Sequence, residues 1–377
     1  MVEWKKLVAV SDVLYGYPFE SSLFSEDSNN IPLIRIRDVK PAKASTYYSG
    51  TILDDYIVKR GDILVGMDGE FNLGRWNDRD GLLNQRVLKL KGKNESCIDG
   101  YLFHYMGPIF KKIEKETPGG SVKHLSAKII KDILIPIPSL SEQQRIVGIL
   151  DTFTAGIKNI KEQIAQRRKQ YEFYRDQLLD LEGKEGVEMK TLGEVGKFVR
   201  GSGILKSDFV EVGYPCIHYG QIHTKYSLST KKVISRVEKS LYDRCKKAVK
   251  GDVVLATTSE DADGCAKPVA WLGDEEIAIS SDAYIYHHHQ NGKFMAHQFA
   301  THRFMQFKIK NVTGAKVVRI SGENLAKFVF PLPSLSEQQR IVSILDTFET
   351  SIQNLEAQLK QREKQYEYYR NKLLTFE

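Results

Sequence analysis

The chain has 377 residues, of which 41% are hydrophobic and 27% charged, a composition typical of globular rather than disordered proteins. No run approaches the roughly 18 apolar residues that a membrane helix needs, and the opening MVEWKKLVAV is too short and too charged for a secretory signal. We therefore expect a cytoplasmic protein of two or more domains. The net charge of +7 favours a polyanionic partner without identifying one.

Short β-branched runs punctuated by glycine predict strands at residues 31–36, 62–65 and 86–90, followed by a helix near residues 98–115. A similar series follows later in the chain. It comprises strands at residues 251–256 and 283–286 and a helix near residues 294–308. Each series predicts a globule that mixes strands and short helices.

A long internal repeat separates and ends these globules. Residues 138–182 recur as residues 333–377 at a constant offset of 195, and 29 of the 45 paired positions are identical. Each copy opens with PSLSEQQ, in which Ser141 and Ser336 are predicted to cap a helix while Gln144 and Gln339 reach back to it.

Apolar residues in both copies recur at alternating steps of four and three, a period of 3.5 residues. This period predicts a coiled-coil seam rather than the wider stripe of a helix that lies on a globular core. The two helices are therefore expected to pair with each other. The predicted seam residues are Ile146, Leu150, Phe153, Ile157, Ile160, Ile164, Ile341, Leu345, Phe348, Ile352, Leu355 and Leu359.

The globules before the helices are also related, more weakly. Residues 33–35 resemble residues 216–218, and residues 60–64 resemble residues 250–254. We therefore predict a duplicated, mixed α/β fold whose two helices pair as an antiparallel coiled coil with pseudo-twofold symmetry. The predicted boundaries are a first globule at 1–137, a helix at 138–182, a linker at 183–188, a second globule at 189–332 and a helix at 333–377.

Catalytic and metal-binding patterns are missing from the sequence. Gly69 and Gly74 have the spacing of a phosphate loop, but Arg75 and Trp76 follow where Lys and Ser or Thr are needed. The N-P-P-aromatic tetrad of amino-methyltransferases and a dinucleotide-binding glycine fingerprint are absent. The four cysteines lack metal-site spacing, and the triplet at 287–289 is expected to be a solvated strand end. We predict neither catalytic residues nor a metal.

The duplicated globules, each ending in PSLSEQQRIV-x-ILD at 138–151 and 333–346, resemble the specificity subunit of type I restriction-modification systems over the whole chain. The resemblance implies that each globule is a target-recognition domain reading half of a split, asymmetric DNA site, with the helices setting the spacer. It also implies assembly with two methyltransferase subunits and with restriction subunits that translocate DNA. AdoMet, ATP and Mg²⁺ would bind those partners, and this chain would hold no cofactor.

Planar donors such as Arg, Asn and Gln read base edges, whereas Lys and backbone amides contact phosphates. On this basis, the predicted DNA-contacting residues are Arg35, Arg37, Met67, Asn72, Arg75, Gln85, Lys123 and His124 in the first half, with the loop at 67–76. In the second half they are His218, Tyr219, Gln221, Lys225, Thr258, Lys267, Lys316 and Arg319, with the loop at 257–267. Arg86 and Asp282 could equally be ion-pair members that face the core.

Two rival interpretations remain open at this stage. A coiled-coil assembly scaffold without base reading would explain the helices, although the divergence lies in the globules while the helices stay alike. A nuclease or methyltransferase fragment is disfavoured by the missing motifs. Sequence-dependent DNA binding would separate the specificity subunit from the scaffold, and AdoMet binding by the chain alone would favour the fragment.

Overall fold

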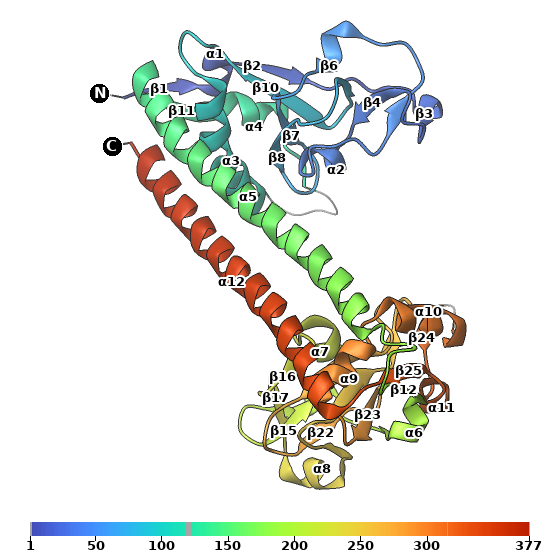
Figure 1. Cartoon of the computed structure of the whole chain (residues 1–377). Coiled ribbons are helices and arrows are strands. Elements are labelled where there is room, and N and C mark those ends of the chain that lie inside the picture. Colours follow the sequence, from blue (N-terminus) through green and yellow to red (C-terminus); the bar gives the residue numbers. More distant parts are fainter. Residues whose placement is uncertain (1, 118–122, 315, 377) are drawn as a thin grey trace. The chain divides into compact units, whose positions relative to one another are not determined.

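The computed structural model describes residues 2–117, 123–314 and 316–376. It divides into two compact units, which we call unit 1 (Met1–Lys161 with Gln358–Glu377) and unit 2 (Glu162–Ala357). Both units mix strands and helices, as predicted, and both include part of each long helix, α5 (Leu140–Leu179) and α12 (Leu335–Leu374) (Figure 1).

Unit 1 contains two larger sheets and a two-stranded ribbon. The first sheet has the order β2 (Ser11–Tyr15), β10 (Val87–Gly92), β7 (Ile63–Gly66) and β8 (Leu73–Arg75), all antiparallel. The second has the order β3 (Phe24–Ser25), β5 (Tyr47–Tyr48), β4 (Ile31–Ile34), β9 (Gly81–Leu83) and β6 (Ile57–Val58). The ribbon pairs β1 (Glu3–Lys6) with β11 (Leu134–Ile137), and the helices are α1 (Leu7–Val10), α2 (Ile36–Val39), α3 (Asp99–Glu116) and α4 (Ala127–Asp132).

Unit 2 repeats this plan with two five-stranded sheets. One has the order β13 (Gly196–Arg200), β23 (Ala283–His288), β19 (Val253–Ala256), β21 (Lys267–Trp271) and β16 (Ser229–Thr230). The other has the order β14 (Phe209–Val210), β17 (Ser235–Val237), β15 (Tyr214–Ile217), β22 (Ile277–Ile279) and β18 (Lys247–Ala248). The ribbons are β12 (Glu188–Thr191) with β25 (Val329–Leu332), and β20 (Thr258–Ser259) with β24 (Val318–Arg319). The helices are α6 (Leu192–Val195), α7 (Tyr219–Thr224), α8 (Lys239–Arg244), α9 (Gly292–Gln298), α10 (His302–Asn311) and α11 (Gly322–Ala326).

Equivalent turns confirm the weak sequence duplication. Gly61 and Gly251 lie before β7 and β19 with φ of 98° and 99°, values that favour glycine because it has no Cβ. In each turn the next aspartate accepts a backbone hydrogen bond, Asp62 from Lys59 at 2.8 Å and Asp252 from Val249 at 2.7 Å. The two units therefore share one local frame.

Two predicted elements end earlier than expected. The strand at 31–36 stops at Ile34, because the amide of Arg35 donates to Asp38 Oδ2 at 2.9 Å and α2 begins at the next residue. The helix at 294–308 is two helices, α9 and α10. Thr301 Oγ1 accepts a hydrogen bond from the Phe304 amide at 3.2 Å, which caps a new helix start.

The caps of the long helices lie two residues before the predicted ones. The Oγ atoms of Ser139 and Ser334 accept hydrogen bonds from the amides of Glu142 and Glu337, at 3.3 and 3.4 Å. The prediction that Ser141 and Ser336 are the caps is therefore wrong, since both lie inside the first helical turn.

The first turns of each long helix lie on a globular core, which corrects the interpretation of the whole stripe as a helix seam. Ile146 and Leu150 are fully buried in the core of unit 1, to which α3 and several strands contribute, and Ile341 and Leu345 are fully buried in the core of unit 2. A core stripe and a coiled-coil seam share nearly the same spacing in a short window, which explains the error.

Farther along, the two helices contact each other within each unit. In unit 1 the Phe153 ring stacks on Tyr369 with centroids 5.2 Å apart, and in unit 2 Tyr174 stacks on Phe348 at 5.4 Å. The remaining predicted seam residues are half-buried, apart from Ile164, which is buried; they are Ile157, Ile160, Ile352, Leu355 and Leu359.

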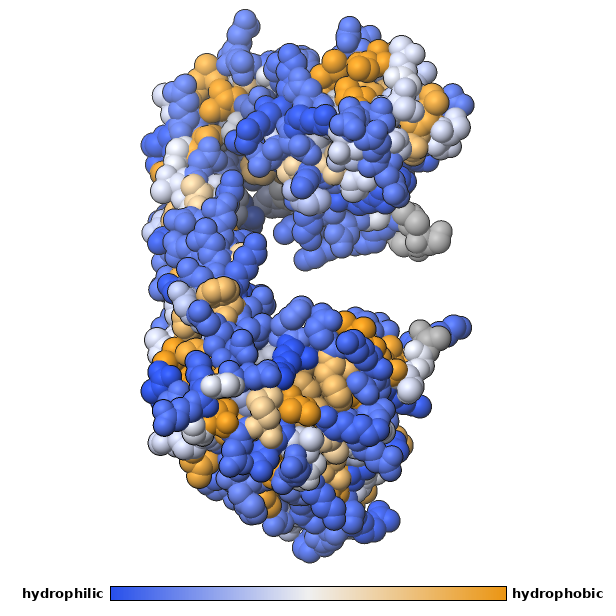
Figure 2. All heavy atoms as spheres, turned by 45° about the vertical axis from the view of Figure 1, so that its right-hand side comes forward, coloured by the Kyte–Doolittle hydropathy of each residue, from blue (hydrophilic) through white to orange (hydrophobic). Residues whose placement is uncertain are grey.

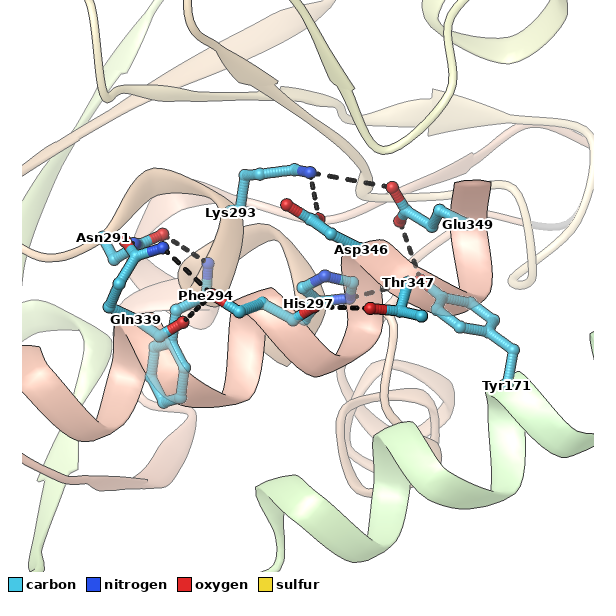
Figure 3. Close-up of polar contacts among 10 residues, drawn as sticks. Tyr171, Asn291, Lys293, Phe294, His297, Gln339, Asp346, Thr347 and Glu349 are labelled. Atoms are coloured by element: carbon cyan, nitrogen blue, oxygen red, sulfur yellow. Dashed lines mark hydrogen bonds and ion pairs between the residues drawn. The ribbon is translucent and has the colours of Figure 1, made fainter. Parts of the chain in front are cut away.

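A polar cluster fastens the end of α5 to unit 2 (Figure 3). The Tyr171 hydroxyl donates to Glu349 Oε1 at 3.1 Å and lies 3.3 Å from Nδ1 of His297 in α9. Lys293, also in α9, forms ion pairs with Asp346 and, at 3.7 Å, with Glu349. Both carboxylates belong to α12, so residues of α5, α9 and α12 meet in one partly buried network.

Candidate nucleic-acid interface

A cavity of about 560 Å³ lies in unit 1, beside the residues that follow β4 and β9 and the loop between β7 and β8. Four of the predicted DNA-contacting residues line it together: Arg35, Arg37, Asn72 and Gln85. The other lining residues are Ile36, Lys40, Pro41, Glu70, Asn84 and Arg86. Four cationic side chains and one carboxylate make this cavity strongly basic, which suits a polyanion.

The arginines of α2 are held in place rather than freely mobile. Arg37 donates from Nε to Ser45 Oγ at 2.9 Å and from a terminal nitrogen to Thr46 Oγ1 at 2.6 Å. The buried Asp38 accepts a hydrogen bond from Ser45 Oγ at 2.6 Å, so it fixes the position of the hydroxyl that accepts from Arg37. Arg35 lies with its guanidinium carbon 5.8 Å from the Phe24 ring centroid.

Arg86 occupies a special position in this cavity that the sequence did not reveal. Its φ of 69° lies in the left-handed region, which is uncommon for a residue with a long side chain. Nε lies 3.4 Å from Asp68 Oδ2, and His124 Nδ1 lies 2.6 Å from Asp68 Oδ1. Arg86 therefore belongs to an ion pair, as one interpretation held. Its side chain is 54% exposed, so it does not face the core.

Asn84 brings an unsatisfied polar atom to the same cavity. The residue is 4% exposed, and its Oδ1 has no hydrogen-bond partner among the described residues. An orphaned buried acceptor costs free energy unless a ligand or a water molecule supplies a donor. Asn84 was not among the residues predicted from the sequence, because the burial of its Oδ1 depends on tertiary packing.

Three predicted residues of unit 1 are engaged elsewhere. Met67 is 7% exposed and packs in the core, so its side chain does not reach the surface. The Arg75 guanidinium lies 4.6 Å from the Phe103 ring centroid, with Nε and one terminal nitrogen buried. Lys123 Nζ donates to the carbonyl oxygen of Glu114 in the last turn of α3.

Unit 2 presents the same frame with different side chains. His218 is the N-cap of α7, as Arg35 is of α2, and Gln221 accepts from the His218 amide at 3.2 Å, as Asp38 does from Arg35. Arg319 pairs with Thr258 between β24 and β20, where His124 faces Asp68 in unit 1.

Asp282 stands in the place of Arg86. The backbone carbonyl of Asp282 accepts from the Thr257 amide at 3.0 Å, and that of Arg86 accepts from the Met67 amide at 2.8 Å. The Asp282 side chain lies 3.8 Å from a terminal nitrogen of Arg200, whose Nε donates to the Ser281 carbonyl at 2.9 Å. An acidic residue in one unit therefore replaces a basic one in the other.

Other predicted residues of unit 2 differ in their availability. His218 is buried, and burial lowers its pKa; its ring lies 4.6 Å from that of Tyr219. Lys267 Nζ donates to the His223 carbonyl at 3.0 Å, and burial lowers its pKa. Gln221 Nε2 donates to Ser235 Oγ at 2.5 Å, so it joins α7 to the first residue of β17. The exposed cations are Lys225, Lys316 and Arg319.

The histidine triplet is a solvated strand end only in part, because His289 is exposed whereas His287 and His288 are half-buried. His287 Nδ1 lies 2.9 Å from Asp252 Oδ2, and burial lowers the pKa of His288 to about 4. The expectation of solvation was wrong for His288 because β23 is an inner strand of its sheet. Among the described residues, no group of three or more His, Cys, Asp or Glu side chains could hold a metal ion.

The surface drawn in Figure 2 is mainly hydrophilic, with hydrophobic residues in separate patches. None of the helices in the described ranges is long and apolar enough to cross a membrane.

Comparison with known proteins identifies the family. The model of the type I restriction modification DNA specificity domain matches residues 1–167 and again residues 184–363. The specificity subunit of the Escherichia coli type I restriction enzyme EcoR124I/EcoR124II is 34% identical over 318 residues, which cover 80% of this chain and 77% of that protein. The EcoBI specificity subunit of the same species is 39% identical over 166 residues, 43% of this chain and 35% of its own length.

A solved structure shows the same fold. The crystal structure of the type I restriction-modification S subunit from M. genitalium superposes with a TM-score of 0.59 and 14% identity, covering 100% of this chain and 97% of that one. The family match extends over both units, as does the structural match. This chain therefore belongs to the DNA specificity family of type I restriction-modification systems.

Proposed function

We propose that this chain is the non-catalytic DNA-reading subunit of a type I restriction-modification complex, in which unit 1 and unit 2 each read one half of a bipartite, asymmetric site. The observation that carries the proposal is that the two units share one backbone arrangement but carry different side chains at equivalent positions. Arg35, Asp68, Arg86 and His124 in unit 1 correspond to His218, Thr258, Asp282 and Arg319 in unit 2. Equivalent positions with different hydrogen-bonding groups are expected if the units meet different bases.

The proposal assigns the spacing between the half-sites to the long helices. Each helix is continuous over 40 residues and contributes to both units. Inserting one heptad into both helices, after Gly156 and after Ser351, is expected to lengthen the spacer in the methylated motif while leaving both half-sites unchanged. An unchanged spacer in a folded variant would contradict this role.

The helices are also proposed to dock two methyltransferase subunits. Phe173 in α5 and Tyr368 in α12 occupy equivalent positions of the repeat, and both are unusually exposed aromatic residues, at 62% and 60%. Two equal apolar sites are suited to two copies of one partner. Replacing both residues with Ala should weaken co-purification of the methyltransferase without changing the stability of this chain, and Lys169→Ala with Lys364→Ala is the matched control on the same helices.

The decisive experiment maps N6-methyladenine genome-wide in cells with the cognate methyltransferase subunit, with and without this chain. A split motif around a fixed spacer that disappears when this chain is deleted supports the proposal. Identical methylation in an otherwise active system would favour the coiled-coil scaffold.

A further inference from the structure

The turn after β9 in unit 1 and the equivalent turn after β22 in unit 2 carry opposite charges. Arg86 in unit 1 and Asp282 in unit 2 hold the same backbone position, since each carbonyl accepts the amide that follows β7 or β19. Arg86 lines the basic cavity beside Gln85 and Asn84. At this position the two units therefore have opposite hydrogen-bonding character: an arginine that only donates in unit 1 and a carboxylate that accepts in unit 2.

Asp68 orients the Arg86 side chain in a way that leaves its donors usable. The carboxylate approaches Nε at 3.4 Å from one oxygen and His124 Nδ1 at 2.6 Å from the other. At that distance His124 donates its Nδ1 hydrogen to Asp68, so the same nitrogen cannot accept from the Arg86 terminal nitrogen 3.4 Å away. Both terminal nitrogens of Arg86 thus keep free hydrogens.

A guanidinium held through Nε presents two parallel donors, the pattern that matches O6 and N7 of guanine in the major groove. In unit 2, Asp282 cannot donate to O6 or N7, so guanine cannot be read in this way there.

We propose that Arg86, positioned by Asp68, reads a guanine in the half-site that unit 1 recognises. The inference rests on the proposed function and names the base and the residue behind one position of the site. The left-handed backbone of Arg86 aims the side chain at the cavity, and a strained conformation kept at a surface turn is typical of a functional residue.

The test uses the complete complex with its methyltransferase subunits and duplexes in which each base pair of the wild-type motif is replaced in turn. Wild type should discriminate against replacement of one G·C pair in the unit 1 half by roughly 5- to 150-fold in binding. Arg86→Asn keeps a residue that tolerates positive φ but removes the fork, so it should reduce this discrimination to a few-fold at that pair alone. Asp68→Asn should reduce the discrimination only partly, because the Arg86 guanidinium remains but loses the carboxylate that orients it.

Arg60→Asn is the matched control. Arg60 is an exposed arginine of the same unit that donates to Asn77 Oδ1 at 3.1 and 2.9 Å, outside the residues that line the cavity. It should leave discrimination at every base pair unchanged.

Three results would overturn the inference: unchanged discrimination in Arg86→Asn, an equal loss at all base pairs, or a unit 1 half-site without a G·C pair. An equal loss would identify Arg86 as a phosphate contact. Failure of the proposed function is recognised separately, because the wild-type complex would then show no bipartite motif at all.

Discussion

The Tyr366 hydroxyl, near the end of α12, lies 3.1 Å from Nδ1 of His104 in α3, across 262 positions of sequence. Nε2 of the same ring lies 2.7 Å from Asp151 Oδ1 in α5. Burial lowers the pKa of His104, so the ring is neutral near pH 7, donates to Asp151 from Nε2 and accepts from Tyr366 at Nδ1. The last helix of the chain thus completes the interior of unit 1.

Tyr366→Phe should therefore destabilise unit 1. The variant leaves the buried Nδ1 of His104 without a donor, at a cost of about 1–3 kcal/mol. Urea denaturation measures the loss, and amide hydrogen exchange should locate it in α3 and the adjoining turns of α5. Tyr368→Phe, at a 60% exposed position two residues away, is the control and should behave as wild type. Faster exchange in unit 2 alone would contradict the assignment of Tyr366 to unit 1.

The start of α5 is predicted to behave as core and its middle as a helix contact. Leu150→Ala removes a fully buried side chain and should cost about 2–5 kcal/mol, because a cavity is left among α3 residues. Ile157→Ala, two turns later and half-buried, should cost roughly 1 kcal/mol. Equal losses in urea denaturation would restore the interpretation of one uniform seam.

The long helices were predictable because their signals are local. The repeat and the 3.5-residue period located both ends of each helix to within three residues, since caps and helical periodicity depend on neighbours in sequence. The same signals could not separate a core stripe from a seam. That difference depends on which tertiary surface covers Ile146 and Leu150, and no local pattern records it.

The candidate site was predictable only in part, for a similar reason. Arg35 and Gln85 were singled out as planar donors near turns, and the structure brings them to one cavity. Arg86 was left undecided, because its role depends on a left-handed backbone and on Asp68 from another loop. Met67 was included as part of a glycine-rich loop, but tertiary packing draws it into the core.

The stability of unit 2 should fall in acid through His297. Burial, together with the positive charges of Lys293 and Arg175, lowers the pKa of His297 from 6.5 to about 3. As the pH falls below about 6.5, His297 is protonated in the unfolded chain but stays neutral in the folded chain. The stability that this residue contributes is therefore fully present above pH 6.5 and is lost progressively toward pH 3.

His297→Leu isolates this contribution from those of other groups, such as Glu349, whose pKa is raised by burial. Between pH 6 and 5 the stability of wild type should fall more steeply than that of the variant, by at most about 1.4 kcal/mol per pH unit. Urea midpoints across this range measure both slopes. His289→Gln, at an exposed position of the triplet, should keep the wild-type slope, and parallel slopes for wild type and His297→Leu would refute a buried neutral histidine.

The backbone at position 86 allows stability and recognition to be separated. Glycine adopts a φ of 69° without the Cβ clash that costs other residues about 1–2 kcal/mol, while loss of the exposed pair with Asp68 costs at most about 1 kcal/mol. Arg86→Gly should thus be at least as stable as wild type in urea, and Arg86→Val, β-branched and unsuited to positive φ, should be less stable by about 1–3 kcal/mol.

Both variants lack the guanidinium, so both should lose discrimination at the same G·C pair whatever their stability. A glycine variant that folds well and reads that pair poorly would show that the strained turn is kept for recognition. If Arg86→Val proved as stable as Arg86→Gly, the left-handed conformation itself would be wrong. If Arg86→Gly kept full discrimination, the base contact would belong to another residue of the cavity, with Arg35 and Gln85 the next to replace.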